Sequence, residues 1–200
     1  MRVLLVLSLS ICLLFSVATM ASADVFRITP EISNAKLETG SLSESGNVYY
    51  LSGDLNFIVV RTGIDLGYGE IEDLEYTTSG VRIGTELPLF FFKLIAYGGY
   101  QNYKFEGNGL SDEFKGTILG AGIEYELNDF FSLRGVVQVP IDMELKGSND
   151  DIDFNSAKLD MIFTTLPLVD VFVGYRAVKF ETDSRDWDLS GFTAGVRVGI

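Results

Sequence analysis

The sequence predicts an all-β fold, an antiparallel up-and-down transmembrane β-barrel of ten strands, with eight strands as the alternative. Three observations lead to this prediction. Long segments alternate between apolar and polar residues, which gives each strand one apolar face. No apolar run after residue 23 reaches the roughly 20 residues that a helical membrane span needs. Long and short connections alternate between the segments, as they do in membrane barrels.

The first 23 residues have the pattern of a cleaved signal peptide. Arg2 supplies the positive charge, residues 3–17 are apolar, and small residues end the segment. Cys12, the only cysteine, lies in this segment, so the mature chain has no thiol for a disulfide or a metal. We therefore expect a signal peptide over residues 1–23 and a barrel over residues 24–200.

The longest uninterrupted alternation covers residues 130–145. Its odd positions, from Phe131 to Leu145, carry no charge, whereas Arg134 and Glu144 occupy even positions. The segment is much longer than an ordinary strand of about 5–6 residues. At about 3.3 Å per residue it would extend over about 53 Å. Pro140 interrupts it, and because proline cannot donate to a ladder we expect a bulge or a missing hydrogen bond there.

Ten segments show this alternation. They lie near residues 25–37, 48–57, 60–68, 77–87, 91–106, 114–127, 130–145, 153–166, 170–182 and 188–200. Their apolar faces contain, in chain order, Phe26 and Ile32; Tyr49 and Leu55; Ile64 and Leu66; Val81 and Ile83; Leu119 and Ile123; Val137 and Val139; Leu159 and Met161; Val171 and Val173; and Phe192 and Val196. The fifth segment is missing from that series because either its odd or its even residues could form the apolar face. In the ninth segment the alternation becomes irregular near Lys179.

The connections between these segments predict the orientation of the barrel. Long connections are expected near residues 38–47, 69–76, 107–113, 147–152 and 183–187, and short ones near 56–58, 88–90, 128–129 and 167–169. Outer-membrane barrels have short periplasmic turns and longer outer loops. Both chain ends fall on the side of the short turns, so we expect both termini in the periplasm.

Glycines and aromatics indicate which face points inward. The polar face carries Gly63, Gly67, Gly84, Gly120, Gly122, Gly174 and Gly195, which suit a crowded lumen. Aromatics gather near the short turns (Phe57, Phe90, Phe91, Phe130, Phe131) and near the long loops (Tyr49, Tyr68, Tyr103, Phe105, Phe114, Phe154, Phe180). We expect them to form two interfacial girdles, with the apolar face toward lipid. Trp187 is expected at the tip of the last loop, as an interface anchor or a partner contact.

On this pattern the chain resembles the bacterial outer-membrane β-barrel proteins, in the manner of the small OmpA and OmpX/Ail-like barrels. The resemblance covers the whole mature chain and implies an outer-membrane location, with lipid, lipopolysaccharide and the barrel-assembly machinery as partners. Two features depart from it. Those barrels usually have eight strands, and they tend to end on an aromatic residue, where this chain has Ile200.

The absence of histidine limits the chemistry. A serine hydrolase triad needs an imidazole base, and the enzymes of the resembled family, such as the omptin proteases, use a histidine. Histidine-ligated and thiolate-ligated metal sites are excluded with it. We therefore expect no enzyme activity and no cofactor. The formal net charge of −13 also argues against a nucleic-acid partner.

The polar face carries a regular series of charges expected to line the lumen, either as structural groups or along a pore. They are Arg27, Glu31, Asp54, Arg61, Asp65, Arg82, Glu86, Glu124, Arg134, Asp142, Lys158, Asp160, Arg176 and Arg197. They could include a catalytic carboxylate pair, but a ladder of ion pairs is the simpler interpretation because lone buried charges are costly. The acidic loop residues at 70–75 and 150–153 could bind divalent cations or be solvated.

Two functions remain open. The first is a non-enzymatic barrel with a charge-paired lumen and a structural or surface-interaction role in the cell envelope. The alternative is a narrow, porin-like path for ions or small solutes, because ten strands leave slightly more interior space than eight.

Overall fold

A computed structural model describes residues 25–57, 60–107, 109–148, 152–166, 168–183 and 185–199, so the expected signal peptide lies outside the described residues. Ten strands are present: β1 (Phe26–Thr39), β2 (Leu42–Phe57), β3 (Val60–Ile71), β4 (Leu74–Leu89), β5 (Phe92–Gly107), β6 (Leu110–Asn128), β7 (Phe131–Leu145), β8 (Asp153–Leu166), β9 (Val169–Glu181) and β10 (Asp186–Gly199). Among the described residues, no helix is long and apolar enough to cross a membrane.

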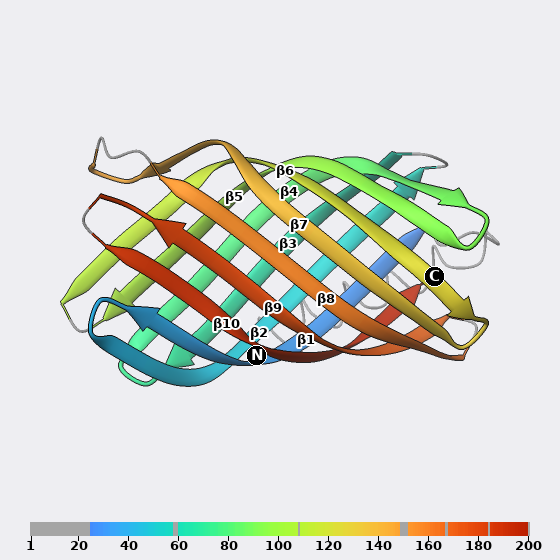
Figure 1. The fold of residues 1–200 in the computed structure, drawn as a ribbon, viewed down its shortest axis with the longest axis horizontal. Coiled ribbons are helices and arrows are strands. Elements are labelled where there is room, and N and C mark those ends of the chain that lie inside the picture. Colours follow the sequence, from blue (N-terminus) through green and yellow to red (C-terminus); the bar gives the residue numbers. More distant parts are fainter. Residues whose placement is uncertain are drawn as a thin grey trace, which may run out of the picture.

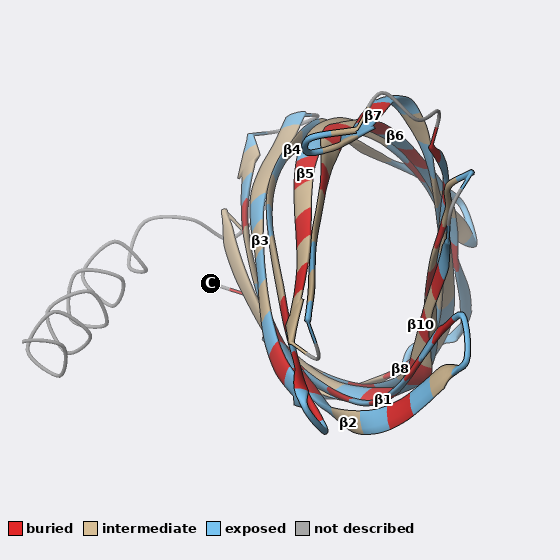
Figure 2. Cartoon of the chain, turned by 90° about the vertical axis from the view of Figure 1, so that its left-hand side faces the viewer, coloured by how far each residue is buried: buried red, intermediate tan, exposed pale blue. Residues whose placement is uncertain are grey.

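The ten strands form one closed antiparallel barrel, as predicted (Figure 1). Each strand pairs with its neighbours in the sequence, and β1 pairs with β10 to close the ring, with Ile32 opposite Ala194. Figure 2, which looks along the barrel, shows this ring. We call the end where β1 begins and β10 finishes the proximal end, and the opposite end the distal end.

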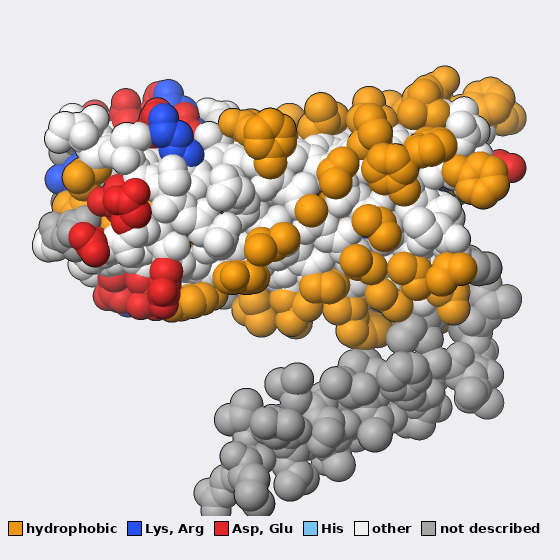
Figure 3. Space-filling view, turned by 90° about the horizontal axis from the view of Figure 1, so that it is seen from below, with side chains coloured by type: hydrophobic (Ala, Val, Ile, Leu, Met, Phe, Trp, Pro, Cys, Tyr) orange, Lys and Arg blue, Asp and Glu red, His pale blue; other side chains and the backbone are white. Residues whose placement is uncertain are grey.

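The apolar face of the wall points outward. Val81, Ile83 and Ile141 expose 55%, 60% and 59% of their surface, whereas Asp54 is 1% exposed. Apolar side chains cover the wall in Figure 3, and charged side chains gather on its distal end. A barrel that dissolves in water would bury the apolar face instead. The orientation is therefore the one expected for contact with lipid.

The polarity of the two faces reverses toward the distal end, although the alternation keeps its phase. On β1 the outward side changes from Ile32 to Lys36, and the inward side changes from Glu31 to Leu37, which is 1% exposed. The same reversal explains the loss of phase predicted near Lys179, which is outward and half-buried. A wall that leaves lipid for water needs a polar exterior, and its interior can then become an apolar core.

β2, β3, β4 and β6 are longer than predicted, and the expected alternation of long and short connections was wrong in part. The connections expected near 38–47, 69–76 and 107–113 are short, because β2, β4 and β6 begin at Leu42, Leu74 and Leu110. Gly40 and Glu72 have φ values of 58° and 51°, the left-handed conformation that two-residue hairpins favour. The polar residues that suggested loops mostly form the outward faces of strands beyond the apolar band.

A β-bulge occurs at Pro140, as predicted. Ile118 lies opposite Pro140 and Thr117 lies opposite Asp142, so Ile141 is an extra residue on β7. One extra residue moves every following side chain to the other face. Met143 is consequently buried, and Asp142 is exposed on the outside of the barrel. The expectation that Asp142 faces the lumen was therefore wrong.

The assignment of the apolar band to lipid can be tested by placing an arginine on the outward face of β6 at two levels. Ile123 lies midway along the outward apolar run of β6, so Ile123→Arg should lower the free energy of unfolding by about 2–4 kcal/mol in lipid vesicles. Ser111→Arg, on the outward face at the distal end of the same strand, should cost about 0–1 kcal/mol. Urea-induced unfolding measures both changes. Equal costs would contradict the assignment of the apolar band.

Candidate functional site

The lumen of the proximal half is filled with charged side chains, which the alternation of each strand directs inward. The bases are Arg27, Arg61, Arg82, Lys93, Arg134, Lys158, Arg176 and Arg197, and the acids are Glu31, Asp54, Asp65, Glu86, Glu124, Glu126, Asp160 and Asp170. Bases and acids are equal in number. The lumen is therefore close to neutral, although the whole chain is strongly acidic.

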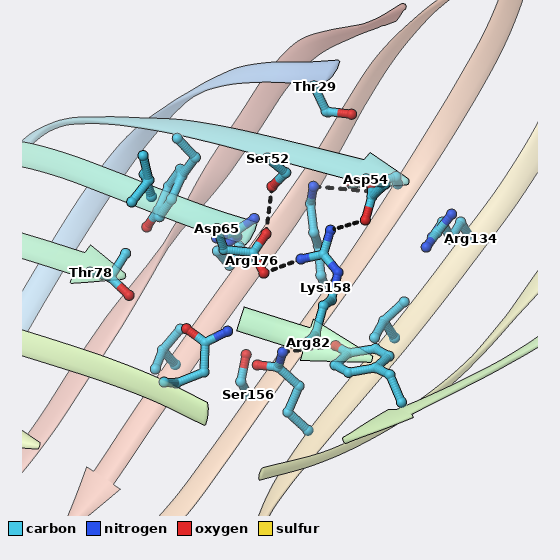
Figure 4. Close-up of a pocket in the computed structure, with 18 of the residues that line it drawn as sticks. Thr29, Ser52, Asp54, Asp65, Thr78, Arg82, Arg134, Ser156, Lys158 and Arg176 are labelled. Atoms are coloured by element: carbon cyan, nitrogen blue, oxygen red, sulfur yellow. Dashed lines mark hydrogen bonds and ion pairs between the residues drawn. The ribbon is translucent and has the colours of Figure 1, made fainter. Parts of the chain in front are cut away.

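Asp54 is the centre of the first group of ion pairs. Its carboxylate accepts hydrogen bonds from Arg61 Nη2 at 2.5 Å and from Arg82 Nη2 at 2.7 Å. Arg82 also binds Asp65, which accepts a further hydrogen bond from Ser52 Oγ at 2.6 Å (Figure 4). One carboxylate from β2 thereby links the neighbouring strands β3 and β4 on the inner face of the wall.

Glu124 is the centre of the second group. Arg134, Lys93 and Arg197 lie 3.3, 3.0 and 3.8 Å from its carboxylate oxygens. Arg134 also contacts Glu86 at 3.2 Å, and Glu86 binds Arg61 of the first group. The two groups therefore form one connected network that extends from β2 to β10.

Glu31 on β1 is the centre of the third group. Lys158 Nζ donates to it at 2.5 Å, and Arg176 Nη2 lies at 3.1 Å. Lys158 also lies 3.2 Å from Asp160. The guanidinium of Arg176 sits 4.0 Å from the centre of the Tyr50 ring, which is a cation–π contact. Arg176 is thus the point at which the charged half of the lumen meets the aromatic half.

Thirteen of the fourteen charges expected in the lumen take part in these ion pairs, and Asp142 does not. Three members of the network, Lys93, Glu126 and Asp170, are absent from the set of lumen charges predicted from the sequence. Lys93 lies on the strand whose phase was ambiguous, and it contacts Glu124 and Glu126. Asp170, which contacts Arg197 at 3.7 Å, lies at the start of the ninth segment and shares the phase of Arg176, so the alternation alone could have identified it.

The two larger cavities of the charged half could hold water. The central one has a volume of about 150 Å³ and is lined by polar side chains such as Ser52, Gln101, Gln138 and Ser156. The second has a volume of about 280 Å³ and lies at the proximal end, where Glu126 and Asp129 are among the residues that line it. Both volumes are large enough for several water molecules.

Aromatic side chains fill the distal half of the lumen. This group, here called the aromatic plug, consists of Tyr76, Tyr103, Phe105, Phe114, Phe154, Phe180 and Trp187, each at most 5% exposed. Phe105 stacks on Trp187 with ring centres 4.6 Å apart, and Phe114 stacks on Phe180 at 4.3 Å. Aliphatic side chains such as Leu37 and Ile71 pack around them.

The plug corrects two expectations. Five of the aromatics assigned to the girdle near the long loops point inward: Tyr103, Phe105, Phe114, Phe154 and Phe180. Only Tyr49 and Tyr68 of that set are exposed. Trp187 is neither an interface anchor nor a partner contact, because it is 1% exposed and lies within β10. The girdle at the proximal end is present, with Phe90, Phe91 and Phe130 exposed.

The lumen offers little acid–base chemistry. A catalytic carboxylate would need access to a substrate proton, whereas the oxygens of Asp54 and Glu124 are engaged by two and three cations. Among the residues that the structure describes, no group of acidic side chains is arranged to hold a metal ion. The geometry favours the interpretation of these charges as a ladder of ion pairs.

Comparisons with known proteins agree with this architecture. The family model of the outer membrane protein beta-barrel domain matches residues 7–161. The chain is similar to the outer membrane protease OmpT from Escherichia coli, with a TM-score of 0.64, 11% identity and coverage of 92% of this chain and 99% of that one. It is also similar to the β domain of the Bordetella autotransporter BrkA, with a TM-score of 0.56, 9% identity and coverage of 88% and 100%.

A third structure, that of Neisserial surface protein A, has a TM-score of 0.49 and 17% identity over 90% of this chain and 100% of its own. No curated protein sequence matches the chain. At such low identities these likenesses extend to the fold alone.

The ion-pair network predicts a large stability effect at its centre. Asp54→Asn should lower the free energy of unfolding by about 3 kcal/mol, the lower end of the range for breaking a buried pair, because Arg61 and Arg82 keep their second acids. Urea-induced unfolding measures the loss. The matched control is Glu38→Gln, which breaks an exposed pair with Lys36 and should change stability little. Similar losses in the two variants would contradict a central role for Asp54.

A second prediction concerns pH at the distal rim, outside the apolar band. The hydrogen bond from Lys146 at 2.8 Å holds the pKa of Glu113 below its ordinary value of 4.5, with help from Asn102. Because the folded pKa is lowered, the pair stabilises the barrel above pH 4.5 and loses this effect as pH falls through the folded pKa. NMR titration should give a midpoint below 4.5, and Lys146→Met should return it toward that value. An unchanged midpoint in the variant would show that Lys146 does not cause the lowered pKa of Glu113.

Proposed function

Because the chain belongs to the outer membrane protein beta-barrel domain family, we propose that it is a non-enzymatic barrel of the bacterial outer membrane with a closed lumen. Its role is structural or one of surface interaction in the cell envelope. The observation that carries this proposal is the aromatic plug, because it fills the distal half of the lumen with packed rings. A solute that entered from the proximal end would have to displace these rings to leave.

The proposed orientation places both termini in the periplasm and the distal end outside the cell. The exposed phenylalanines at the proximal turns suit a membrane interface, and the charged strand ends at the distal side suit water. The expected surroundings are outer-membrane lipid and lipopolysaccharide, and assembly would use the barrel-assembly machinery. The carboxylates of the distal rim could meet cations held by lipopolysaccharide.

The absence of enzyme activity is part of the proposal. The chain has no histidine, and cations engage the buried carboxylates of the lumen. The likeness to OmpT, which is described as a protease, is one of fold at 11% identity and brings no active-site residue with it. The role proposed for the charges is to hold the wall together.

A narrow pore remains the second candidate, and the two polar cavities favour it. Together they provide a hydrated region over the charged half of the lumen. Such a pore would need a passage through the aromatic plug. Conductance therefore separates the two candidates.

Purified protein in planar lipid bilayers should show no steady conductance. Phe105→Ala combined with Trp187→Ala removes two stacked rings from the plug and should produce channel openings, because it opens space in the group of side chains that closes the distal half. The control is Phe192→Ala, which removes an outward ring that is 75% exposed and should leave the barrel without conductance.

Steady channels in the unaltered protein would overturn the closed-lumen proposal and support the pore. Arg134→Gln would then test the path, because Arg134 lies in the lumen and its charge should set ion selectivity. Asp142 cannot serve this purpose, since its side chain is outside the barrel.

A further inference from the structure

Within the described residues, the barrel wall has a seam between the distal parts of β7 and β8. Pairing of these strands ends at Gln138 opposite Ser156. β7 nevertheless continues along β6 as far as Leu145, and β8 continues along β9 as far as Asp153. Residues 139–145 of β7 and 153–155 of β8 therefore have strand edges that pair with no strand that the structure describes.

Local chemistry explains why the pairing stops. Pro140 has no N–H to donate, so it is suited to an edge. The bulge at Ile141 moves the register by one residue, and continued pairing would place Asp142 directly opposite Asp153. Like charges at opposite positions add a cost to a pair of strands. Glu70 and Glu75 lie opposite each other on paired strands, so the proline and the bulge are what distinguish this site. Neither aspartate forms an ion pair with another described residue.

The two faces of the seam differ in character. On the inside, Met143 and Phe154 are buried beside the aromatic plug. On the outside, Asp142 and Asp153 are exposed on the two sides of the seam. Glu144 is also outward, but it already binds Lys115 at 3.0 Å. A strand that paired with the β7 edge would meet apolar side chains inside and, outside, two carboxylates that no described cation engages.

We propose that the β7 edge beyond Pro140 binds an extended peptide in which basic and apolar residues alternate. Its main chain would hydrogen-bond to the free edge, as in other cases of strand addition. Because side chains alternate along a strand, its basic residues would face Asp142 and Asp153 while its apolar residues would face Met143. The inference rests on the proposed surface-interaction role and is independent of whether the lumen conducts.

The same features disfavour two other occupants. A second copy of this chain would bring its own Asp142 and Glu144 to the shared edge, where like charges repel. A lipid acyl chain could cover the exposed side chain of Ile141, but it offers no partner for backbone N–H groups or for carboxylates. A cationic, extended peptide satisfies all three requirements of the seam.

Binding can be measured with the mature protein in detergent micelles and a fluorescent octapeptide of alternating valine and lysine. Anisotropy should rise on binding, and hydrogen exchange should slow at the β7 amides between residues 141 and 145. A peptide of four valines followed by four lysines has the same composition and charge but the wrong alternation. It should bind about tenfold more weakly, as should alternating valine and glutamate.

Charge reversal provides the decisive variant. Asp142→Lys with Asp153→Lys should transfer the preference to the valine–glutamate peptide. The matched control is Glu70→Lys with Glu75→Lys, which reverses two opposite acids on β3 and β4 where the strands remain paired, and it should leave the preference unchanged. If the reversed variant fails to fold, as judged by the heat-dependent shift on SDS gels, Asp142→Asn with Asp153→Asn should weaken binding of the valine–lysine peptide.

Equal binding of the alternating and block peptides would overturn the proposal, because it would indicate adsorption to an acidic surface alone. Unchanged exchange at residues 141–145 would overturn it as well, since strand addition must protect these amides. A conducting lumen would overturn the closed-barrel proposal and leave the result for the β7 edge intact, so failures of the two proposals are distinguishable.

Discussion

Burial of charge behind a lipid-facing wall is the constraint on which the rest of this barrel depends. The outward face of each strand cannot carry charge where it meets hydrocarbon, so the charges of the proximal half lie inside. A buried charge persists only with a partner, and the partners come from other strands. Lys158 on β8, for example, binds Glu31 on β1 across the lumen. The ion pairs therefore link strands that are distant in sequence and favour one register for all of them.

The same constraint explains the aromatic plug. Beyond the apolar band the exterior is polar, as at Lys36, and the interior no longer has to hold the charges. The inward positions can then form an ordinary apolar core, which adds stability from burial that the charged half lacks. Arg176 joins the two regions, because it binds Glu31 on one side and lies over the Tyr50 ring on the other. The barrel thus has a membrane-protein interior at one end and a soluble-protein interior at the other.

This division shows how much could be predicted from the sequence. Alternation predicted ten strands, an outward apolar face and the inward charges, because period 2 reports which residues share a face. Glycine on the polar face was also informative: a Cβ at Gly120 would lie 2.2 Å from the Tyr97 ring inside the barrel. Individual ion pairs could not be predicted, because each depends on the register and on rotamers of strands that are far apart.

Alternation alone does not indicate which medium lies on each side of the wall. Aromatics near strand ends commonly mark a lipid interface, which predicts Phe180 on the exterior, and the sequence predicts Trp187 at a loop tip. The reversed polarity of the distal half places both in the core. Asp142 was misassigned for a different reason. The bulge at Pro140 moves each following side chain of β7 to the other face, whereas unbroken alternation predicts Asp142 inside.

The position of the seam follows from the same physics as the ion pairs. Inside hydrocarbon every backbone N–H and C=O must be hydrogen-bonded within the wall, and the β7–β8 ladder is continuous from Phe131 to Gln138. It ends at the distal margin of the apolar band, where Val139 and Ile141 are the last apolar outward residues before Asp142. Water can hydrate a strand edge there, so a proline, a bulge and two opposed carboxylates are tolerated together. Pro140 and the bulge at Ile141 therefore mark the level of the wall above which backbone groups can hydrogen-bond to water instead of to a neighbouring strand.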